Sequence, residues 1–281
     1  MPRTVTVPEV LAAKGRQPLV MITAYDAPTA RWGEAAGAEM LLVGDSLAMV
    51  VLGHDNTLAV TMEEMLHHAR AVMRASSKSL VVGDLPFGAY QTSVEATVEA
   101  GIRYLKEAGV HAVKLEGAWP ERVEALVQAG IPVMGHLGLT PQSVNRFGGY
   151  RVQGKTVESG RALIAAARDL ELAGCFSLVL EGVPAEVAAE ITRAVGIPTI
   201  GIGAGPDCDG QVLVIHDLLG ITPPPYPRFV VPYAELGQAA ERAIGSWAAD
   251  VRARRVPTAE QSYYLKPDVA RDWRRLFTEE A

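Results

Sequence analysis

The chain has 281 residues, of which 49% are apolar, and this is enough to form one large core or two ordinary ones. A net charge of -6 and a pI of about 5.6 leave no basic stripe for a phosphate backbone, so nucleic acid is not an expected partner. No run reaches the roughly 18 apolar residues of a membrane span, and the first residues, MPRTVTVPEV, lack the apolar core of a signal peptide, so we expect a soluble cytoplasmic protein that contacts no membrane.

Eight apolar runs along the chain are typical of short buried strands. After a helix predicted for residues 4–14, the runs lie at residues 18–25, 35–43, 79–84, 107–115, 128–135, 172–180, 194–202 and 211–217. Five of them contain a glycine that can end a preceding helix in the left-handed conformation: Gly37, Gly109, Gly130, Gly174 and Gly196. Their Val, Ile and Leu content indicates strands that are buried on both faces, as in a parallel sheet.

Helical patterns separate most of these runs, for example at residues 62–75, 93–107 and 156–173. Eight alternating strand and helix units predict an α/β fold, a single-domain (β/α)8 TIM barrel, with an open doubly wound sheet as the weaker alternative. Because no Pro/Ser-rich linker divides the units, we assign residues 1–256 to the barrel and 257–281 to a C-terminal tail.

Two segments near the C-terminus do not follow this alternation. The Pro-rich stretch ITPPPYPRFVVP, residues 221–232, is predicted to cross the surface in an extended conformation, because proline cannot continue a helix. From about Pro257 the chain is polar and aromatic without a clear period, so we expect a tail that is either disordered or docked elsewhere.

Polar side chains follow the predicted strands at the points where the strands end. In a (β/α)8 barrel the active site lies at these carboxyl ends, where the loops that follow the strands converge. These positions hold Asp45, Ser46, Asp84, Lys114, Glu116, His136 and Glu181. The alternative is that the acids are helix N-caps, a role that Asp fills well and Glu poorly.

Four carboxylates on one rim require a positive partner or a shared proton. Two carboxylates about 4 Å apart repel each other by roughly 4 kcal/mol at an effective dielectric constant of 20. Mg²⁺ fits such a site, because it binds one or two carboxylates, keeps several waters and leaves positions for a chelating substrate. The strand ends therefore predict a hard divalent cation.

Two further features each allow two interpretations. His136 ends the fifth run, where a histidine is equally compatible with a hydrogen-bonded structural role and with a ligand or an acid. The run GIGAGPDCDGQ, residues 201–211, is similar to a glycine-rich phosphate loop, but close backbone packing beside the site explains its glycines equally well.

At these residues the sequence resembles the ketopantoate hydroxymethyltransferase family of pantothenate synthesis. The resemblance runs from about residue 3 to residue 235 and rests on the stretches ITAYDAPTA, LLVGDSLAMVVLGHDNTLAVTMEEM, DLPFGAY, VKLEG, GHLGLTPQSVNRFGGYRVQGK, LVLEGVP, GIGAG and DGQVLVIHDLLG. The long segment GHLGLTPQSVNRFGGY is far more specific than any short motif. The segment EQSYYLKPDVARDWRRLFTEEA, by contrast, has no counterpart in this resemblance.

The resemblance implies particular roles for residues at the strand ends. Asp45 and Asp84 would hold Mg²⁺ and meet the substrate there, with Glu116 nearby as a further ligand or acting through water. Ser46 and Lys114 would bind a 2-oxo acid.

The implied reaction transfers a hydroxymethyl group from 5,10-methylenetetrahydrofolate to 3-methyl-2-oxobutanoate, which gives 2-dehydropantoate for pantothenate and coenzyme A biosynthesis. Glu181 would accept the C3 proton, and Mg²⁺ would stabilise the resulting enolate. The family usually assembles as a decamer, so the resemblance also implies a homodecamer.

Two rival functions use a similar site. A Mg²⁺-dependent 2-oxo acid lyase of the isocitrate lyase and phosphoenolpyruvate mutase type would break carbon-carbon bonds. Such lyases often carry a reactive cysteine in a K-x-C-G-H-like loop, and neither Cys175 nor Cys208 has such neighbours or the C-x-x-C spacing of a redox or zinc site. A non-catalytic binding barrel would keep the pocket without needing a base, so proton exchange separates it from an enzyme.

Overall fold

Eight parallel strands form a closed barrel in the computed structural model, which describes residues 4–278. Each strand pairs with the next in sequence, and β8 pairs with β1. The strands are β1 (Leu19–Thr23), β2 (Met40–Val43), β3 (Leu80–Asp84), β4 (Ala112–Glu116), β5 (Val133–Gly138), β6 (Ser177–Glu181), β7 (Thr199–Ile202) and β8 (Gly210–Leu213). The predicted (β/α)8 barrel is confirmed, and closure between β1 and β8 excludes the open sheet.

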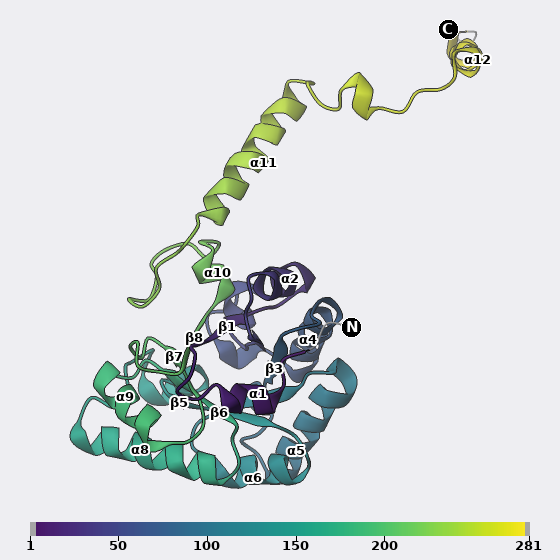
Figure 1. Ribbon diagram of the computed structural model, residues 1–281. Coiled ribbons are helices and arrows are strands. Elements are labelled where there is room, and N and C mark those ends of the chain that lie inside the picture. The colour runs from purple at the N-terminus through teal and green to yellow at the C-terminus, as the bar shows by residue number, and fades with distance from the viewer. Residues whose placement is uncertain (1–3, 279–281) are drawn as a thin grey trace. The chain divides into compact units, whose positions relative to one another are not determined.

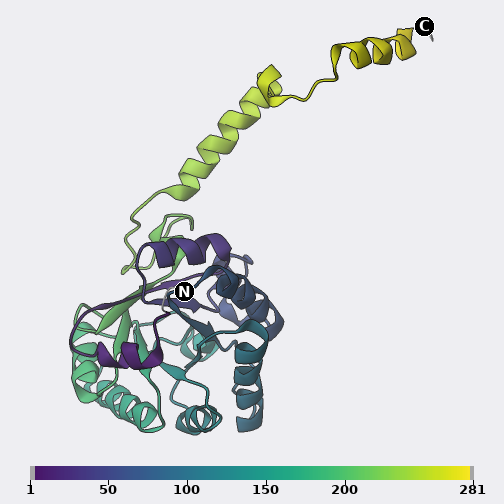
Figure 2. The same cartoon turned by 45° about the vertical axis from the view of Figure 1, so that its right-hand side comes forward.

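Helices surround the strands on the outside of the barrel (Figures 1 and 2). The longer ones are α2 (Ala27–Ala35), α4 (Met62–Ala75), α5 (Val94–Arg103), α6 (Pro120–Gln128), α8 (Val157–Leu172) and α9 (Ala185–Ala194). The shorter ones are α1 (Val7–Ala12), α3 (Leu47–Val50), α7 (Val144–Phe147), α10 (Ile215–Leu218), the 3-10 turns η1 (Thr57–Ala59) and η3 (Pro141–Ser143), and the π-helical turn η2 (Tyr104–Ala108). The helical patterns at 62–75, 93–107 and 156–173 correspond to α4, to α5 with η2, and to α8.

Strand residues alternate between two apolar cores. In β2, Met40 and Leu42 belong to the cluster that fills the barrel, whereas Leu41 and Val43 belong to the larger cluster between the strands and the helices. This alternation follows from the two-residue period of a strand. Because both faces are covered, the strands appear in the sequence as continuous apolar runs.

Helix α1 lies against the amino-terminal end of the barrel. Its residue Val10, together with Ala13, belongs to the apolar cluster inside the barrel. Lys14 Nζ lies 2.7 Å from Asp209 Oδ2, and Asp209 also accepts from the backbone N–H of Gly15 and Thr199. These contacts cover the amino-terminal end of the barrel, opposite to the carboxyl ends of the strands.

Residues from Glu235 onward form a second compact unit, and the first unit ends at Ala234. The second unit contains α11 (Leu236–Arg252), the turn η4 (Ala259–Gln261) and α12 (Pro267–Thr278). The barrel boundary expected after residue 256 falls inside this unit, between α11 and η4, and the domain assignment stays a prediction. Residues 279–281 of the expected tail lie outside the described residues. Within residues 4–278, no helix combines the length and the apolarity that crossing a membrane requires.

Helix α12 corrects the expectation that the tail lacks a helical period. Val269, Trp273, Leu276 and Phe277 are separated by helical spacings and are all exposed. The short stripe is obscured in the sequence, because aromatic residues of the preceding non-helical segment adjoin it and the helix begins only at Pro267. Proline is tolerated at that first position, where its missing N–H has no partner to lose.

Gly138, the last residue of β5, provides a test of how the strand ends are packed. Its φ is +99°, and an added Cβ would collide with the Glu181 carbonyl oxygen and the Val183 side chain. We expect Gly138→Ala to lower the free energy of unfolding by more than about 3 kcal/mol, since left-handed strain and a backbone clash act together. For a domain of this size, that corresponds to a fall of about 6 °C or more in the thermal midpoint.

The matched control is Gly37→Ala at the end of α2. Gly37 has a similar φ of +89°, but an added Cβ would meet no atom within 4 Å. We therefore expect Gly37→Ala to lower the free energy of unfolding by the backbone strain alone, about 1–2 kcal/mol. If differential scanning calorimetry gives Gly138→Ala and Gly37→Ala the same thermal midpoint, the predicted clash of the Gly138 Cβ is refuted.

Candidate active site

The strand period carries polar residues onto the interior face of the barrel at its carboxyl end. In β3, Leu80 and Val82 belong to the interior cluster, and Asp84 continues that face two residues later. The same alternation follows Ala112 in β4, Met134 in β5 and Val179 in β6. It places these predicted site residues at the mouth: Asp84, Lys114, Glu116, His136 and Glu181.

Asp84 and Lys114 of this face form a buried group with Asp45, which follows β2. Lys114 Nζ lies 2.8 Å from Asp84 Oδ1, and the backbone N–H of Asp45 donates to Asp84 Oδ2 at 3.2 Å. All three side chains are buried. The structure therefore brings together residues that belong to the ends of three neighbouring strands, β2, β3 and β4.

The charges in this group do not balance. Burial and the nearby charge of Asp84 raise the pKa of Asp45 well above its ordinary value. Burial also raises the pKa of Asp84, although Lys114 opposes the shift. Burial alone would lower the pKa of Lys114, but Asp84, Glu116 and Asp45 together raise it. Three carboxylates thus surround one lysine, and an additional cation would favour their ionised forms.

The donor set fits Mg²⁺. Among the side chains of residues 4–278, no three His, Cys, Asp or Glu groups are already arranged around a common point as a metal cluster. Asp45 and Asp84 nevertheless provide two buried carboxylates. Mg²⁺ commonly binds one or two carboxylates of a protein and fills its remaining positions with waters and substrate.

Glu116 is held by donors on both oxygens. Its Oε2 accepts the backbone N–H of Gln142 at 3.0 Å, and its Oε1 lies 3.4 Å from His136 Nδ1 and 4.0 Å from Lys114 Nζ. Burial raises the pKa of Glu116, but His136, Lys114 and the Gln142 N–H outweigh burial and lower it. Glu116 is therefore an ionised residue at neutral pH.

His136 lies between two glutamates. Its Nε2 is 3.4 Å from Glu181 Oε2, and its Nδ1 faces Glu116 and lies 3.2 Å from Lys114 Nζ. Burial and the charge of Lys114 lower the pKa of His136, whereas Glu116 and Glu181 raise it, and the balance brings it to about 9. The structure places the histidine among the predicted site residues, and both interpretations, a structural role and a role as ligand or acid, stay predictions.

Ser46 follows Asp45 at the start of α3 and is half-buried. Its Oγ lies 2.8 Å from the Tyr25 hydroxyl, and it makes no hydrogen bond that caps α3. Ser46 thus places a hydroxyl next to Asp45 in the chain, in contact with Tyr25.

The four predicted acids do not cap the helices that follow their strands. The helices that follow β2, β3, β4 and β6 have Ser46, Ser93, Trp119 and Pro184 at their N-cap positions. None of the four predicted acids occupies such a position in these helices, so capping does not explain them.

Three site residues were not singled out from the sequence. Tyr25 contacts Ser46, Gln142 contacts Asp45, and Tyr90 contacts Gln142. All three lie in loops after strands rather than at the strand ends themselves, although each falls within a motif of the family resemblance. A search that included the first residues of each loop would have found Tyr25, whereas Gln142 and Tyr90 lie farther from their strands.

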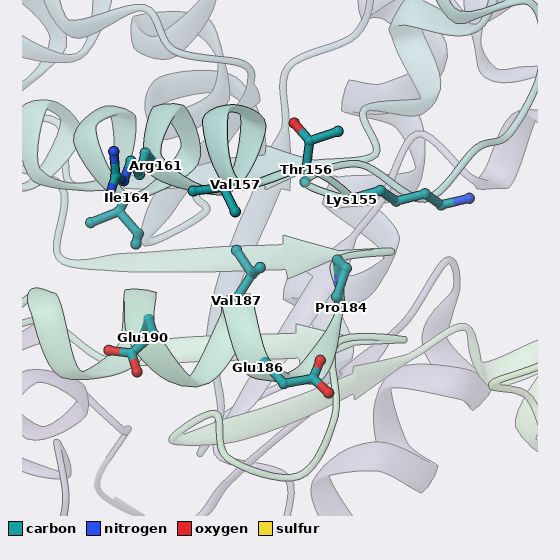
Figure 3. Close-up of a pocket in the computed structure, with 11 residues that line it drawn as sticks. Lys155, Thr156, Val157, Arg161, Ile164, Pro184, Glu186, Val187 and Glu190 are labelled. Atoms are coloured by element: carbon teal, nitrogen blue, oxygen red, sulfur yellow. The ribbon is translucent and has the colours of Figure 1, made fainter.

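A pocket of about 390 Å³ lies elsewhere, between α8 and α9 (Figure 3). It is lined by residues such as Lys155, Arg161, Glu186 and Glu190 and includes none of the predicted site residues. Figure 3 shows Val187 of α9 facing Val157 of α8 across this pocket.

The glycines of residues 201–211 pack closely against neighbouring groups. An added Cβ at Gly203 would meet the Phe229 ring at 2.6 Å, and one at Gly210 would collide with the Leu19 carbonyl oxygen. Close packing therefore accounts for these two glycines, in agreement with the second interpretation of this run.

The protein is a closed (β/α)8 barrel with carboxylates, a buried lysine and a histidine at its strand ends. This combination is typical of a barrel enzyme with an acidic site. A model of the family described as ketopantoate hydroxymethyltransferase matches residues 4–259. The chain belongs to the ketopantoate hydroxymethyltransferase family and is an enzyme, as its sequence motifs predicted.

Two curated relatives named 3-methyl-2-oxobutanoate hydroxymethyltransferase are closely similar. The protein of Syntrophobacter fumaroxidans is 56% identical over 266 residues, which cover 94% of this chain and 94% of the relative. The protein of Oleidesulfovibrio alaskensis is 54% identical over 273 residues, which cover 96% of this chain and 94% of the relative.

Solved structures with a similar fold are much more distant in sequence. A 2,3-dimethylmalate lyase of the PEP mutase/isocitrate lyase superfamily is 15% identical, with a TM-score of 0.57 over 98% of this chain and 99% of that one. A phosphonopyruvate hydrolase in complex with oxalate and Mg²⁺ is 14% identical, with a TM-score of 0.56 over 91% of this chain and 93% of that one. At these identities the similarity concerns the fold alone, so it does not favour the lyase alternative.

Proposed function

We propose that this enzyme transfers a hydroxymethyl group from 5,10-methylenetetrahydrofolate to 3-methyl-2-oxobutanoate and forms 2-dehydropantoate, a step of pantothenate and coenzyme A biosynthesis. Membership in the family and the names of its relatives support this reaction. The proposal includes a homo-oligomeric state, a homodecamer by resemblance, and a cytoplasmic location.

In this proposal Asp45 and Asp84 would hold Mg²⁺, with the nearby Glu116 as a further ligand or acting through a water. The raised pKa values of the two buried aspartates support a cation site. A hydrolase of similar fold has been solved with Mg²⁺ and oxalate, which is also a small carboxylic acid. When bound, Mg²⁺ supplies Lewis-acid charge that stabilises the enolate of the 2-oxo acid.

Glu181 is proposed as the base that accepts the C3 proton. Its side chain is 18% exposed, whereas those of Lys114, Glu116 and His136 are 2–3% exposed. This is the observation that carries the assignment, because a substrate entering the mouth meets Glu181 before the buried acids. His136 Nε2 lies 3.4 Å from Glu181 Oε2 and can orient this carboxylate toward the mouth.

The proposed sequence of bond changes is balanced. The C3–H bond breaks, its proton goes to Glu181, and its electron pair becomes the carbon-carbon double bond of the enolate. C3 then bonds to the one-carbon unit, and both carbon-nitrogen bonds between that unit and the folate break. One water supplies the hydroxyl oxygen and its proton, and the second water proton and the C3 proton released by Glu181 go to the two nitrogens of tetrahydrofolate. Lys114 and Ser46 bind the oxo acid, and the Lys114 ammonium offsets its negative charge.

A test is the reaction of the full chain with both substrates, followed by proton NMR. We expect 2-dehydropantoate to form with Mg²⁺ and formation to stop with excess EDTA and resume when Mg²⁺ is restored. Cleavage of 2,3-dimethylmalate in the same tube, without hydroxymethyl transfer, would instead support the lyase alternative. Binding of the oxo acid with neither product nor C3 proton exchange in D₂O would indicate a non-catalytic barrel.

A further inference from the structure

The side chain of Gln142 links two carboxylates of the proposed metal site. Gln142 lies in η3, after β5, and is buried. Its Nε2 donates to Asp45 Oδ2 at 2.9 Å and to the Leu85 carbonyl oxygen at 2.9 Å, while its backbone N–H donates to Glu116 Oε2 at 3.0 Å. One uncharged residue therefore bonds to both acids.

The orientation of the Gln142 amide is determined by its neighbours. The Leu85 carbonyl oxygen can only accept, so the amide nitrogen must face it, and the same nitrogen then also reaches Asp45 Oδ2. On the other side, the Tyr90 hydroxyl donates to Gln142 Oε1 at 2.7 Å and accepts the Glu116 N–H at 3.2 Å. Turning the amide over would place an oxygen against the Leu85 carbonyl oxygen and would take away the oxygen to which Tyr90 and Gln91 Nε2 donate.

The two aspartates are held by different kinds of donor. Asp84 pairs with the Lys114 ammonium, whose charge competes with a metal ion for the carboxylate. Asp45 receives a neutral amide, which restrains one oxygen without cancelling the charge. Among the hydrogen bonds found in residues 4–278, Gln142 provides the one side-chain donor to the Asp45 carboxylate, and this donor uses Oδ2 alone.

We propose that Gln142, oriented by Tyr90, is a positioning residue that holds Asp45 for the divalent cation and leaves its Oδ1 to face that cation. This inference rests on the metal site of the proposed function and extends it to two residues that do not bind the ion themselves. Partners that orient a metal ligand typically contribute 10- to 100-fold in affinity. Tyr90 reaches Asp45 through the Gln142 amide, although its hydroxyl also contacts the Glu116 backbone. Its contribution to holding Asp45 therefore disappears when that amide is removed.

The experiment measures metal affinity in the full-length protein without substrate, so activity is not the readout. Mn²⁺ is titrated into wild type, Gln142→Ala, Tyr90→Phe and the double variant, and free Mn²⁺ is followed by electron paramagnetic resonance. We expect Gln142→Ala to weaken Mn²⁺ binding by about 10-fold or more, and Tyr90→Phe to weaken it by less. The double variant should bind as Gln142→Ala does, because coupled residues are not additive.

Two controls separate positioning from a general loss of structure. Gln128→Ala removes an exposed amide on α6 that pairs with Glu124, and it should bind Mn²⁺ as wild type does. Thermal midpoints of the metal-free proteins show whether a variant is folded. If Gln142→Ala does not fold, Tyr90→Phe, which loses a single oxygen atom, replaces it in the test. We then expect folded Tyr90→Phe to bind Mn²⁺ more than twofold more weakly than wild type does.

Several results would overturn the inference. Mn²⁺ affinity of folded Gln142→Ala within twofold of wild type would refute positioning by Gln142. Additive losses in the double variant would show that Tyr90 acts independently of the amide. Wild type that binds no Mn²⁺ would overturn both this inference and the metal assignment. Wild type that binds Mn²⁺ but transfers no hydroxymethyl group would overturn only the proposed function.

Discussion

Glu181→Gln is expected to lower kcat for hydroxymethyl transfer by about 10²- to 10⁴-fold, the usual contribution of a positioned general base. Glutamine keeps the shape of the side chain and can still hydrogen-bond to His136, but it cannot accept a proton. The loss corresponds to about 3–5 kcal/mol of transition-state stabilisation. Steady-state rates with saturating substrates measure it, and the affinity for Mg²⁺ should change little because Glu181 is not among the proposed ligands.

Proton exchange gives this prediction a second readout. In D₂O with Mg²⁺, wild type should replace the C3 proton of 3-methyl-2-oxobutanoate with deuterium, which collapses the methyl doublet in the proton NMR spectrum. The exchange is to be followed with and without tetrahydrofolate. Glu186→Gln, at an exposed position of α9, is the matched control and should exchange as wild type does. If Glu181→Gln exchanges as fast as wild type, the base lies elsewhere and His136 becomes the next residue to test.

Asp84→Ala is expected to reduce Mg²⁺-dependent activity by about 10³-fold or more, because a Lewis-acid metal contributes several kcal/mol to transition-state stabilisation. The variant loses a proposed ligand and also leaves Lys114 without its closest carboxylate at 2.8 Å. Asp45→Ala should have a similar effect on activity, although it leaves the Lys114 pair in place.

Both aspartate variants should remain folded, because the carboxylates lie at strand ends outside the apolar clusters. Far-UV circular dichroism checks the fold, and isothermal titration with Mg²⁺ checks the metal. Asp169→Ala on α8 removes an exposed carboxylate and should leave both measurements unchanged. Wild-type Mg²⁺ affinity in folded Asp84→Ala would exclude Asp84 as a ligand.

The eight strands were predictable because a parallel barrel buries both faces of every strand, which makes each strand a continuous apolar run. The strand-end acids were predictable for a related reason. Asp84 and Glu116 end their strands directly, so their position relative to the barrel follows from local sequence alone.

Gln142 and Tyr90 could not be placed in the same way. They belong to loops, and the contacts of Gln142 with Asp45 and of Tyr90 with Gln142 depend on how the loops after β3 and β5 fold over the mouth. The sequence shows the residue types but not these long-range contacts. The state of His136 likewise depends on Glu116, Glu181 and Lys114, which come from two other strands and from opposite sides of the ring.

Helix α12 shows a different limit. Its apolar residues form a short stripe next to aromatic residues that are not helical, so a window over the whole tail averages the period away. Proline at its first position then looks like a break rather than a helix start.

Transfer of a carbon label tests the central claim most directly. The enzyme is incubated with Mg²⁺, unlabelled 3-methyl-2-oxobutanoate and 5,10-methylenetetrahydrofolate carrying ¹³C in its methylene group, and the products are followed by ¹³C NMR. The proposed function predicts that the label appears in the hydroxymethyl carbon of 2-dehydropantoate with wild type and that Glu181→Gln forms this signal at least about 10²-fold more slowly. Label that stays in the folate, or a wild-type rate in Glu181→Gln, would contradict it.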